Sequence, residues 1–195
     1  TRQYIADKKF KIKHNYLKEQ FKDYKTIFKK ISKVVKFNDF TLGFEVERFE
    51  KNFKSLISSK YCIGVGSGTD AIYLALKSLG LKSGDEVLTT PYTFYATINA
   101  IAQADCIPKF VDAQEDFNIN PNLIEKSITK KTKAILVVHW AGRICEMEKI
   151  NKIAKKYNLF VVEDACHAAL AKKDDFFAGN FGHVGCFSLH PLKNL

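Results

Sequence analysis

The sequence predicts an α/β fold in which a mainly parallel (mixed) β-sheet is flanked by helices on both faces. Short apolar runs alternate with amphipathic runs from residue 61 onward. The apolar runs are nearly continuous, which is typical of parallel strands that are buried on both sides. Glycine and proline stand at several junctions, where helices begin or end. Strand-helix alternation of this kind favours one sheet covered by helices over separate helical and β layers.

The expected strands and helices follow from these runs. Gly80 ends one helix, and Pro91 and Pro121 precede two others, as expected for helix boundaries. The predicted strands are 61–65, 86–89, 106–111, 134–139, 159–163 and 184–189, and the predicted helices between them are 69–79, 94–103, 122–128 and 147–157. We therefore expect residues 61–195 to form an α/β domain.

Residues 1–60 differ and are predicted to form a helical N-terminal arm. Apolar residues recur at steps of three and four from Leu17 to Val35, and again from Val46 to Ile57. This segment holds 16 Lys and Arg against 7 Asp and Glu, which is nine of the ten net positive charges. Because the charge is confined to this arm, it does not indicate nucleic-acid binding. A solvated helix face explains it, and attraction for an acidic ligand such as a nucleotide diphosphate is the alternative.

The bulk sequence limits the environment of the chain. No apolar run approaches the length of a membrane span, and the N-terminal lysines are not followed by the apolar region of a secretory signal. The five cysteines are odd in number and form no C-x-x-C pair, which argues against a disulfide framework and a zinc knuckle. We expect a cytoplasmic protein without a membrane segment and without a structural metal.

A glycine-rich loop, Gly64-Val65-Gly66-Ser67-Gly68-Thr69, joins the first predicted strand to a helix. Backbone amides of such a loop, with the positive end of the helix dipole, can bind a phosphate. Two alternatives exist. The dinucleotide pattern G-x-G-x-x-G requires a third glycine where Thr69 stands, and a tight turn without a ligand would also use glycine.

Asp164 directly follows a buried strand and should lie at its carboxyl end. A carboxylate there could pair with the pyridinium nitrogen of pyridoxal 5′-phosphate (PLP), which makes the ring an electron sink. A helix N-cap is one alternative explanation of this aspartate. A metal site of Asp164, Cys166 and His167 with His139 is another, although no ligand pair shows a recognised spacing.

The last predicted strand is followed by Ser188 and then by Lys193. An isolated lysine is usually a surface residue. A strand that supplies a carboxylate, followed by a strand that supplies a serine and a lysine, suits a PLP enzyme in which the lysine forms the imine.

Five motifs in order resemble the DegT/DnrJ family of nucleotide-sugar aminotransferases. They are Gly66-Ser67-Gly68-Thr69-Asp70-Ala71, Pro91-Tyr92-Thr93-Phe94-Tyr95-Ala96-Thr97, His139-Trp140-Ala141-Gly142-Arg143, Glu163-Asp164-Ala165-Cys166-His167-Ala168 and Phe187-Ser188-Leu189-His190-Pro191-Leu192-Lys193-Asn194-Leu195. The resemblance runs from about Leu17 to the end. It implies a PLP-dependent transferase of fold type I, of which the chain holds the N-terminal part of the large domain and lacks the small C-terminal domain.

The resemblance also implies roles for individual residues. Lys193 would be the catalytic residue that forms the imine and moves the proton, and Asp164 would pair with the pyridinium nitrogen. His167 would bind the phenolic oxygen of the cofactor, and Phe94 would stack on its ring. The backbone of Gly68 and Thr69, with the hydroxyl of Ser188, would hold the phosphate.

The implied reaction moves an amino group from L-glutamate to a nucleotide-diphosphate-linked keto-sugar, in the synthesis of amino sugars for surface polysaccharide. The resemblance further implies a homodimer. A truncated, inactive fragment of such an enzyme is the first alternative, and a dinucleotide-dependent sugar-modifying enzyme is a weaker one.

Some positions depart from the family pattern. Cys166 stands where a small residue is usual, Leu192 replaces a smaller or hydroxylated residue, and His183 stands where an acid is common. Relatives with histidine at the lysine position dehydrate sugars, and Lys193 argues against that branch.

Overall fold

The computed structural model describes residues 16–193. The chain divides into two compact units, residues 1–51 and residues 52–195. The assignment of residues 1–60 to an arm and 61–195 to the large domain stays a prediction about the domain organisation of the whole protein.

The first unit is helical where it is described. It contains α1 (Leu17–Gln20), α2 (Tyr24–Phe37) and the beginning of α3 (Phe44–Leu56). The run predicted as one helix from Leu17 is broken at residues 21–23, because Asp23 caps α2 by accepting a hydrogen bond from the Thr26 amide (3.4 Å).

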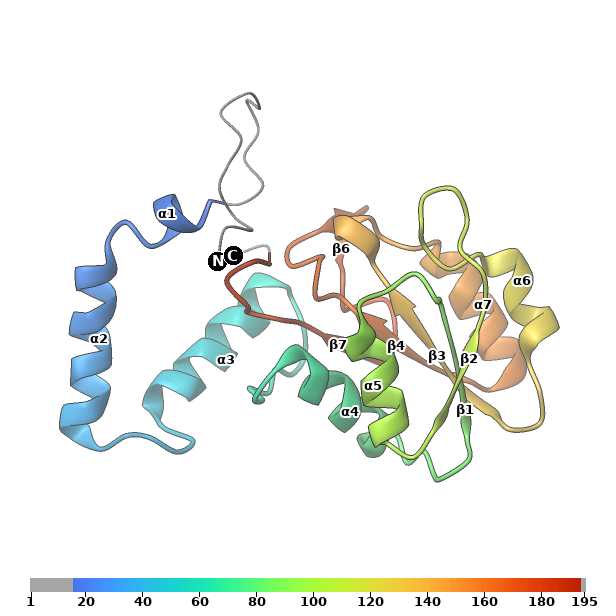
Figure 1. Ribbon diagram of the computed structural model, residues 1–195, viewed down its shortest axis with the longest axis horizontal. Coiled ribbons are helices and arrows are strands. Elements are labelled where there is room, and N and C mark those ends of the chain that lie inside the picture. Colours follow the sequence, from blue (N-terminus) through green and yellow to red (C-terminus); the bar gives the residue numbers. More distant parts are fainter. Residues whose placement is uncertain (1–15, 194–195) are drawn as a thin grey trace. The chain divides into compact units, whose positions relative to one another are not determined.

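The second unit is built on a five-stranded parallel sheet of order β2-β1-β3-β4-β7 (Figure 1). The strands are β1 (Glu86–Thr89), β2 (Ile107–Phe110), β3 (Thr132–Val138), β4 (Phe160–Asp164) and β7 (Val184–Cys186), and the helices are α4 (Gly68–Ser78), α5 (Tyr95–Gln103), α6 (Pro121–Ser127) and α7 (Met147–Tyr157). A short 3₁₀ turn (Trp140–Gly142) follows β3, and the hairpin of β5 (Lys172–Lys173) and β6 (Phe176–Phe177) precedes β7.

Helices cover both faces of this sheet, as predicted. Alternate side chains of a strand point to opposite faces. Leu136 therefore packs with the α4 residue Leu76 in one core, whereas Val137 packs with the α7 residue Ile150 in the other. Figure 1 shows α4 and α5 on one side of the sheet and α6 and α7 on the other. The predicted α/β class with a parallel sheet is confirmed.

One predicted strand is wrong. Residues 61–65 form no strand, and the side chains of Tyr61 and Ile63 are 74% and 78% exposed. A strand requires a neighbouring strand to pair with, and the described sheets contain no pairing with these residues. β7 pairs only with β4, so the described sheet ends at β7. β7 itself is shorter than predicted and ends at Cys186.

Among residues 16–193, no helix is both long enough and apolar enough to span a membrane.

A buried hydroxyl at the end of β1 gives a test of this packing. Thr89 Oγ1 is buried without a hydrogen-bond partner among the described residues, which costs free energy relative to a methyl group. We expect Thr89→Val to leave the free energy of unfolding unchanged or to raise it by about 1 kcal/mol. The matched change Thr97→Val, at a buried hydroxyl that makes two hydrogen bonds, should lower it by about 1–3 kcal/mol. Chemical denaturation measures both, and equal losses would contradict this description.

Candidate functional site

The site lies at the edge of the sheet where β4 and β7 end. The two strands are parallel, with Asp164 opposite Cys186. Parallel strands end at a common edge, so Asp164 and the chain that follows β7 emerge together. That following segment carries Ser188 and Lys193.

Asp164 is nearly buried, at 6% exposure, and both of its carboxylate oxygens accept hydrogen bonds. Oδ2 accepts from the Thr97 hydroxyl (2.8 Å), and Oδ1 accepts from the Cys166 amide (3.1 Å). Since Thr97 donates to Asp164, the Thr93 hydroxyl, 2.8 Å from the Thr97 hydroxyl, must donate to Thr97. These contacts fix the plane of a carboxylate that still has lone pairs for a further donor.

Lys193 and His167 meet beside Asp164. Lys193 Nζ lies 2.8 Å from His167 Nε2. Lys193 Nζ also lies 5.7 Å from the ring centroid of Phe94, within the range of a cation–π contact. Phe94 is 54% exposed and also contacts the Tyr95 ring, with the two ring centroids 4.3 Å apart.

A turn built on His190 delivers Lys193 to this position. His190 Nδ1 accepts a hydrogen bond from the Leu192 amide (3.2 Å), and the His190 carbonyl accepts one from the Lys193 amide (2.8 Å). Pro191 restricts the backbone inside this turn. The sequence His190-Pro191-Leu192 therefore sets the direction in which the lysine leaves the end of β7.

The start of α4 lies against the same segment. A Cβ built on Gly68 would come within 2.9 Å of Cys166 Sγ and 3.0 Å of Ser188 Cβ, so only glycine fits there. Ser67 caps the helix by accepting from the Asp70 amide (3.1 Å). The first amides of a helix, here those of Gly68 and Thr69, have no partner inside the helix. The amides of Gly68 and Thr69, with the side chain of Ser188 close to Gly68, are groups that could hold an anion.

Burial controls the protonation of two neighbouring groups. Burial, with the Lys193 charge as a second cause, lowers the pKa of His167 below the ordinary histidine value. His167 is therefore neutral at neutral pH and can accept a hydrogen bond from the Lys193 ammonium. Burial, followed by the Asp164 carboxylate, raises the pKa of the Cys166 thiol far above its ordinary range, so this cysteine is not a thiolate nucleophile.

The structure places Gly68 beside Ser188 and Lys193 beside His167 and Phe94, and it also bears on the N-cap and metal alternatives for Asp164. A turn rather than a helix follows β4, so Asp164 is not a helix N-cap. His139 uses both ring nitrogens in contacts with Glu163 and the Cys145 amide. Within residues 16–193, no three metal-ligating side chains are grouped as a metal site requires.

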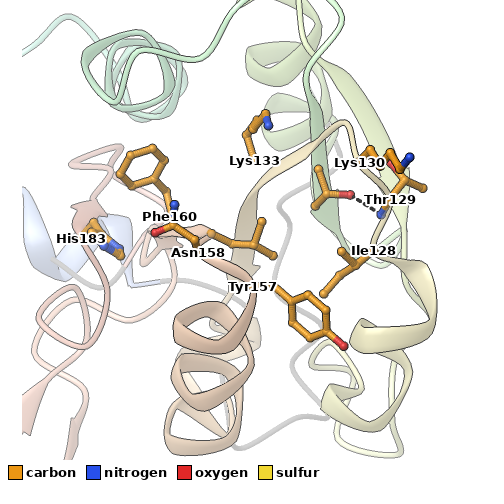
Figure 2. Close-up of a pocket in the computed structure, with 10 residues that line it drawn as sticks. Ile128, Thr129, Lys130, Lys133, Tyr157, Asn158, Phe160 and His183 are labelled. Atoms are coloured by element: carbon orange, nitrogen blue, oxygen red, sulfur yellow. Dashed lines mark hydrogen bonds between the residues drawn. The ribbon is translucent and has the colours of Figure 1, made fainter.

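A second cleft lies away from these residues (Figure 2). Its volume is about 400 Å³, and it opens at the beginning of β3 and β4, the opposite edge of the sheet from Asp164. Lys130, Lys133, Tyr157 and His183 are among its lining residues. None of the predicted site residues reaches it.

Sequence reasoning did not assign the two threonines that support Asp164. Thr97 lies in the first turn of α5, and Thr93 lies just before Phe94, the residue that caps this helix. The two hydroxyls are four residues apart, and their contact depends on the bend of the chain that enters the helix. Their target was hidden, because Asp164 follows Thr97 by 67 residues.

The environment of His167 gives a titration test. We expect an NMR pH titration to place the pKa of His167 below the ordinary value. Lys193→Met should raise that pKa, because it removes a neighbouring positive charge, and Asp164→Asn should lower it further, because it removes a negative one.

The sign of the stability effect follows from this shift. Because the pKa of His167 is lower in the folded than in the unfolded state, protonation of His167 favours unfolding. The free energy of unfolding is therefore at its full value above the unfolded-state pKa, and it falls as the pH drops from that value to the folded-state pKa. A pKa of His167 that does not change in Lys193→Met would contradict the contact.

Known proteins resemble this chain in both sequence and fold. Residues 22–195 match the model of the DegT/DnrJ/EryC1/StrS aminotransferase family. A relative from Aneurinibacillus thermoaerophilus, dTDP-3-amino-3,6-dideoxy-alpha-D-galactopyranose transaminase, is 42% identical over 165 residues, which are 84% of this chain and 46% of that protein.

Two solved structures share the fold. DesV of S. venezuelae, in complex with a ketimine intermediate, has a TM-score of 0.89 and 33% identity and covers 94% of this chain and 50% of its own. NtdA of Bacillus subtilis, with bound cofactor PMP, has a TM-score of 0.87 and 34% identity and covers 98% of this chain and 44% of its own. The chain spans about half the length of the curated relatives that it matches. It belongs to the DegT/DnrJ/EryC1/StrS aminotransferase family.

Proposed function

We propose that the chain carries the cofactor-binding part of a PLP-dependent aminotransferase. The enzyme moves an amino group from L-glutamate to a nucleotide-diphosphate-linked keto-sugar, for amino-sugar and surface-polysaccharide synthesis. The observation that supports this most strongly is the contact of 2.8 Å between Lys193 Nζ and His167 Nε2, at the sheet edge where Asp164 ends β4. A homodimer in the cytoplasm is part of the proposal.

The residues present fit PLP in three respects. The Asp164 carboxylate is held by one donor on each oxygen and keeps acceptor capacity for a protonated ring nitrogen. The Gly68 position admits no side chain, which leaves its amide free to approach a phosphate. Phe94 is half exposed and its ring lies near Lys193, so a planar heterocycle bound beside the lysine could stack on it.

Bound PLP would supply an electron sink for the carbanion that forms when an amino acid loses its α-proton. The residues of this chain would do the rest. Lys193 would supply the amine that acts both as nucleophile and as base. His167, whose Nε2 lies 2.8 Å from Lys193 Nζ, would orient that amine, and the resemblance assigns it the phenolic oxygen of the cofactor, to which a protonated ring nitrogen would donate. Asp164 would keep the ring nitrogen protonated.

The substrate class rests on the relatives. The A. thermoaerophilus relative is by its name a transaminase of a dTDP-linked sugar. The nucleotide-linked keto-sugar and L-glutamate are therefore proposed as the two substrates, and neither a nucleic acid nor a membrane is proposed as a partner.

Covalent trapping of PLP tests the cofactor site. The protein is mixed with PLP, reduced with borohydride and digested, and the peptide with the added pyridoxyl group is identified by mass spectrometry. We expect the group on Lys193, because its amine lies beside His167 and Phe94. Lys193→Arg, which keeps the charge but cannot form the imine, should abolish the label and is the control.

Other outcomes would overturn the assignment. Labelling of Lys130 or Lys133 instead would place the ligand in the opposite cleft. Binding of a nicotinamide cofactor in place of PLP would favour the dinucleotide-dependent alternative. Labelling of Lys193 without conversion of bound PLP to its amine form by L-glutamate would mean an inactive fragment.

A further inference from the structure

Glu163 is a buried carboxylate for which the proposed function has no use. It precedes Asp164 in β4, and its side chain is 0% exposed. Because successive side chains of a strand point to opposite faces, Glu163 lies on the other side of the sheet from Asp164. A buried charge is retained only where several donors stabilise it, so its partners indicate what it does.

Four hydrogen-bond donors surround this carboxylate. Oε2 accepts from His139 Nε2 (2.8 Å) and from the Gly179 amide (2.8 Å). Oε1 accepts from the Phe181 amide (2.7 Å) and from the Gly182 amide. Three of these donors belong to residues 179–182, the loop that joins β6 to β7. The fourth belongs to the end of β3.

The tautomer of His139 follows from its second contact. His139 Nδ1 accepts a hydrogen bond from the Cys145 amide (3.2 Å). A ring nitrogen that accepts carries no proton, so Nε2 carries it and donates to Glu163. All four bonds therefore point toward the carboxylate. A carboxamide at this position would turn an NH₂ group toward one pair of donors and leave those bonds unmade.

The loop that Glu163 holds lies against β7. A Cβ on Gly185 would meet the Gly179 backbone, and a Cβ on Gly179 would come within 2.5 Å of the Phe187 ring. The loop and β7 thus approach each other closely through the backbones of Gly179 and Gly185, so a shift of the loop would be felt by β7. β7 continues directly into Ser188 and the turn that carries Lys193.

His139 connects the same carboxylate to the other side of the site. The residue after His139, Trp140, has its ring centroid 5.4 Å from that of His167. His167 in turn contacts Lys193. Two series of contacts therefore connect Glu163 to Lys193. One runs through the β6–β7 loop and β7, and the other runs through His139, Trp140 and His167.

We propose that Glu163 is a positioning residue: its carboxylate holds the β6–β7 loop and His139, and so fixes Ser188, Lys193 and His167 at the cofactor site. The inference rests on the proposed function for its effect on PLP. Its effect on the loop stands independently of PLP.

The test compares Glu163→Gln with Glu86→Gln. Glu86 is the control, because its Oε2 accepts from the Thr129 and Thr132 hydroxyls, which can rotate to suit a carboxamide, and its ion pair with Lys109 (3.7 Å) also lies at the opposite edge of the sheet, away from the β6–β7 loop. Hydrogen exchange is measured without PLP in peptides that cover residues 178–187. We expect faster exchange in Glu163→Gln and wild-type exchange in Glu86→Gln, because only the first change breaks bonds to the loop.

The PLP arm separates positioning from stability. PLP affinity is measured in Glu163→Gln and in an Ile150 variant, Val or Ala, chosen to match its loss of stability in the core on the same sheet face. We expect Glu163→Gln to bind PLP at least about tenfold more weakly, and the Ile150 variant to bind it as the wild type does.

Each outcome is decisive. Unchanged exchange in residues 178–187 would overturn the inference, and so would equal PLP affinities in the two stability-matched variants. If wild type itself binds no PLP, the proposed function fails, while the hydrogen-exchange measurement still tests whether Glu163 holds the loop.

If Glu163→Gln does not fold, His139→Ala, which leaves the three backbone donors in place, should still weaken PLP binding. Wild-type PLP affinity in that variant would refute the route through His139.

Discussion

The parallel pairing of β4 and β7 is the constraint on which the site depends. It places Asp164 opposite Cys186, so a carboxylate and the segment that leads to Lys193 leave the sheet at one edge. A shift of one residue in this pairing would turn every side chain of β7 to the other face. The register of this strand pair therefore matters for the site as well as for packing. A Cβ at Gly182 or Gly185 would meet neighbouring backbone, which limits the other registers that β7 could adopt.

The two adjacent acids of β4 point to opposite faces of the sheet and therefore have different partners. Asp164 points to the face where Thr97 of α5 donates to it, supported by Thr93 just before that helix. Glu163 points to the face where the β6–β7 loop supplies backbone amides. Asp164 accepts one hydrogen bond on each oxygen and keeps acceptor capacity for a ligand, whereas Glu163 accepts two on each oxygen, all from the protein. Hydrogen bonding, rather than residue type, distinguishes the two roles.

Much of this organisation could be predicted from the sequence, for identifiable reasons. Helix α7 and strand β1 were predicted at their observed bounds, since each has a clear period and is bounded by polar turns. Residues 61–65 were mispredicted, because an apolar run says nothing about whether a neighbouring strand is present. The seven proposed site residues were assigned through motifs. The support of Thr97 for Asp164 was not, because that contact joins residues far apart in the sequence.

The central claim is that Lys193 and Asp164 face one planar ligand between them. A crystal structure of the protein with PLP tests it most directly. The account predicts the pyridine nitrogen within hydrogen-bond distance of Asp164, the ring against Phe94, and a covalent bond from the cofactor to Lys193 Nζ. A ring bound in the cleft beside Lys130 and Lys133, or a Lys193 amine turned away from Asp164 with the cofactor present, would contradict it.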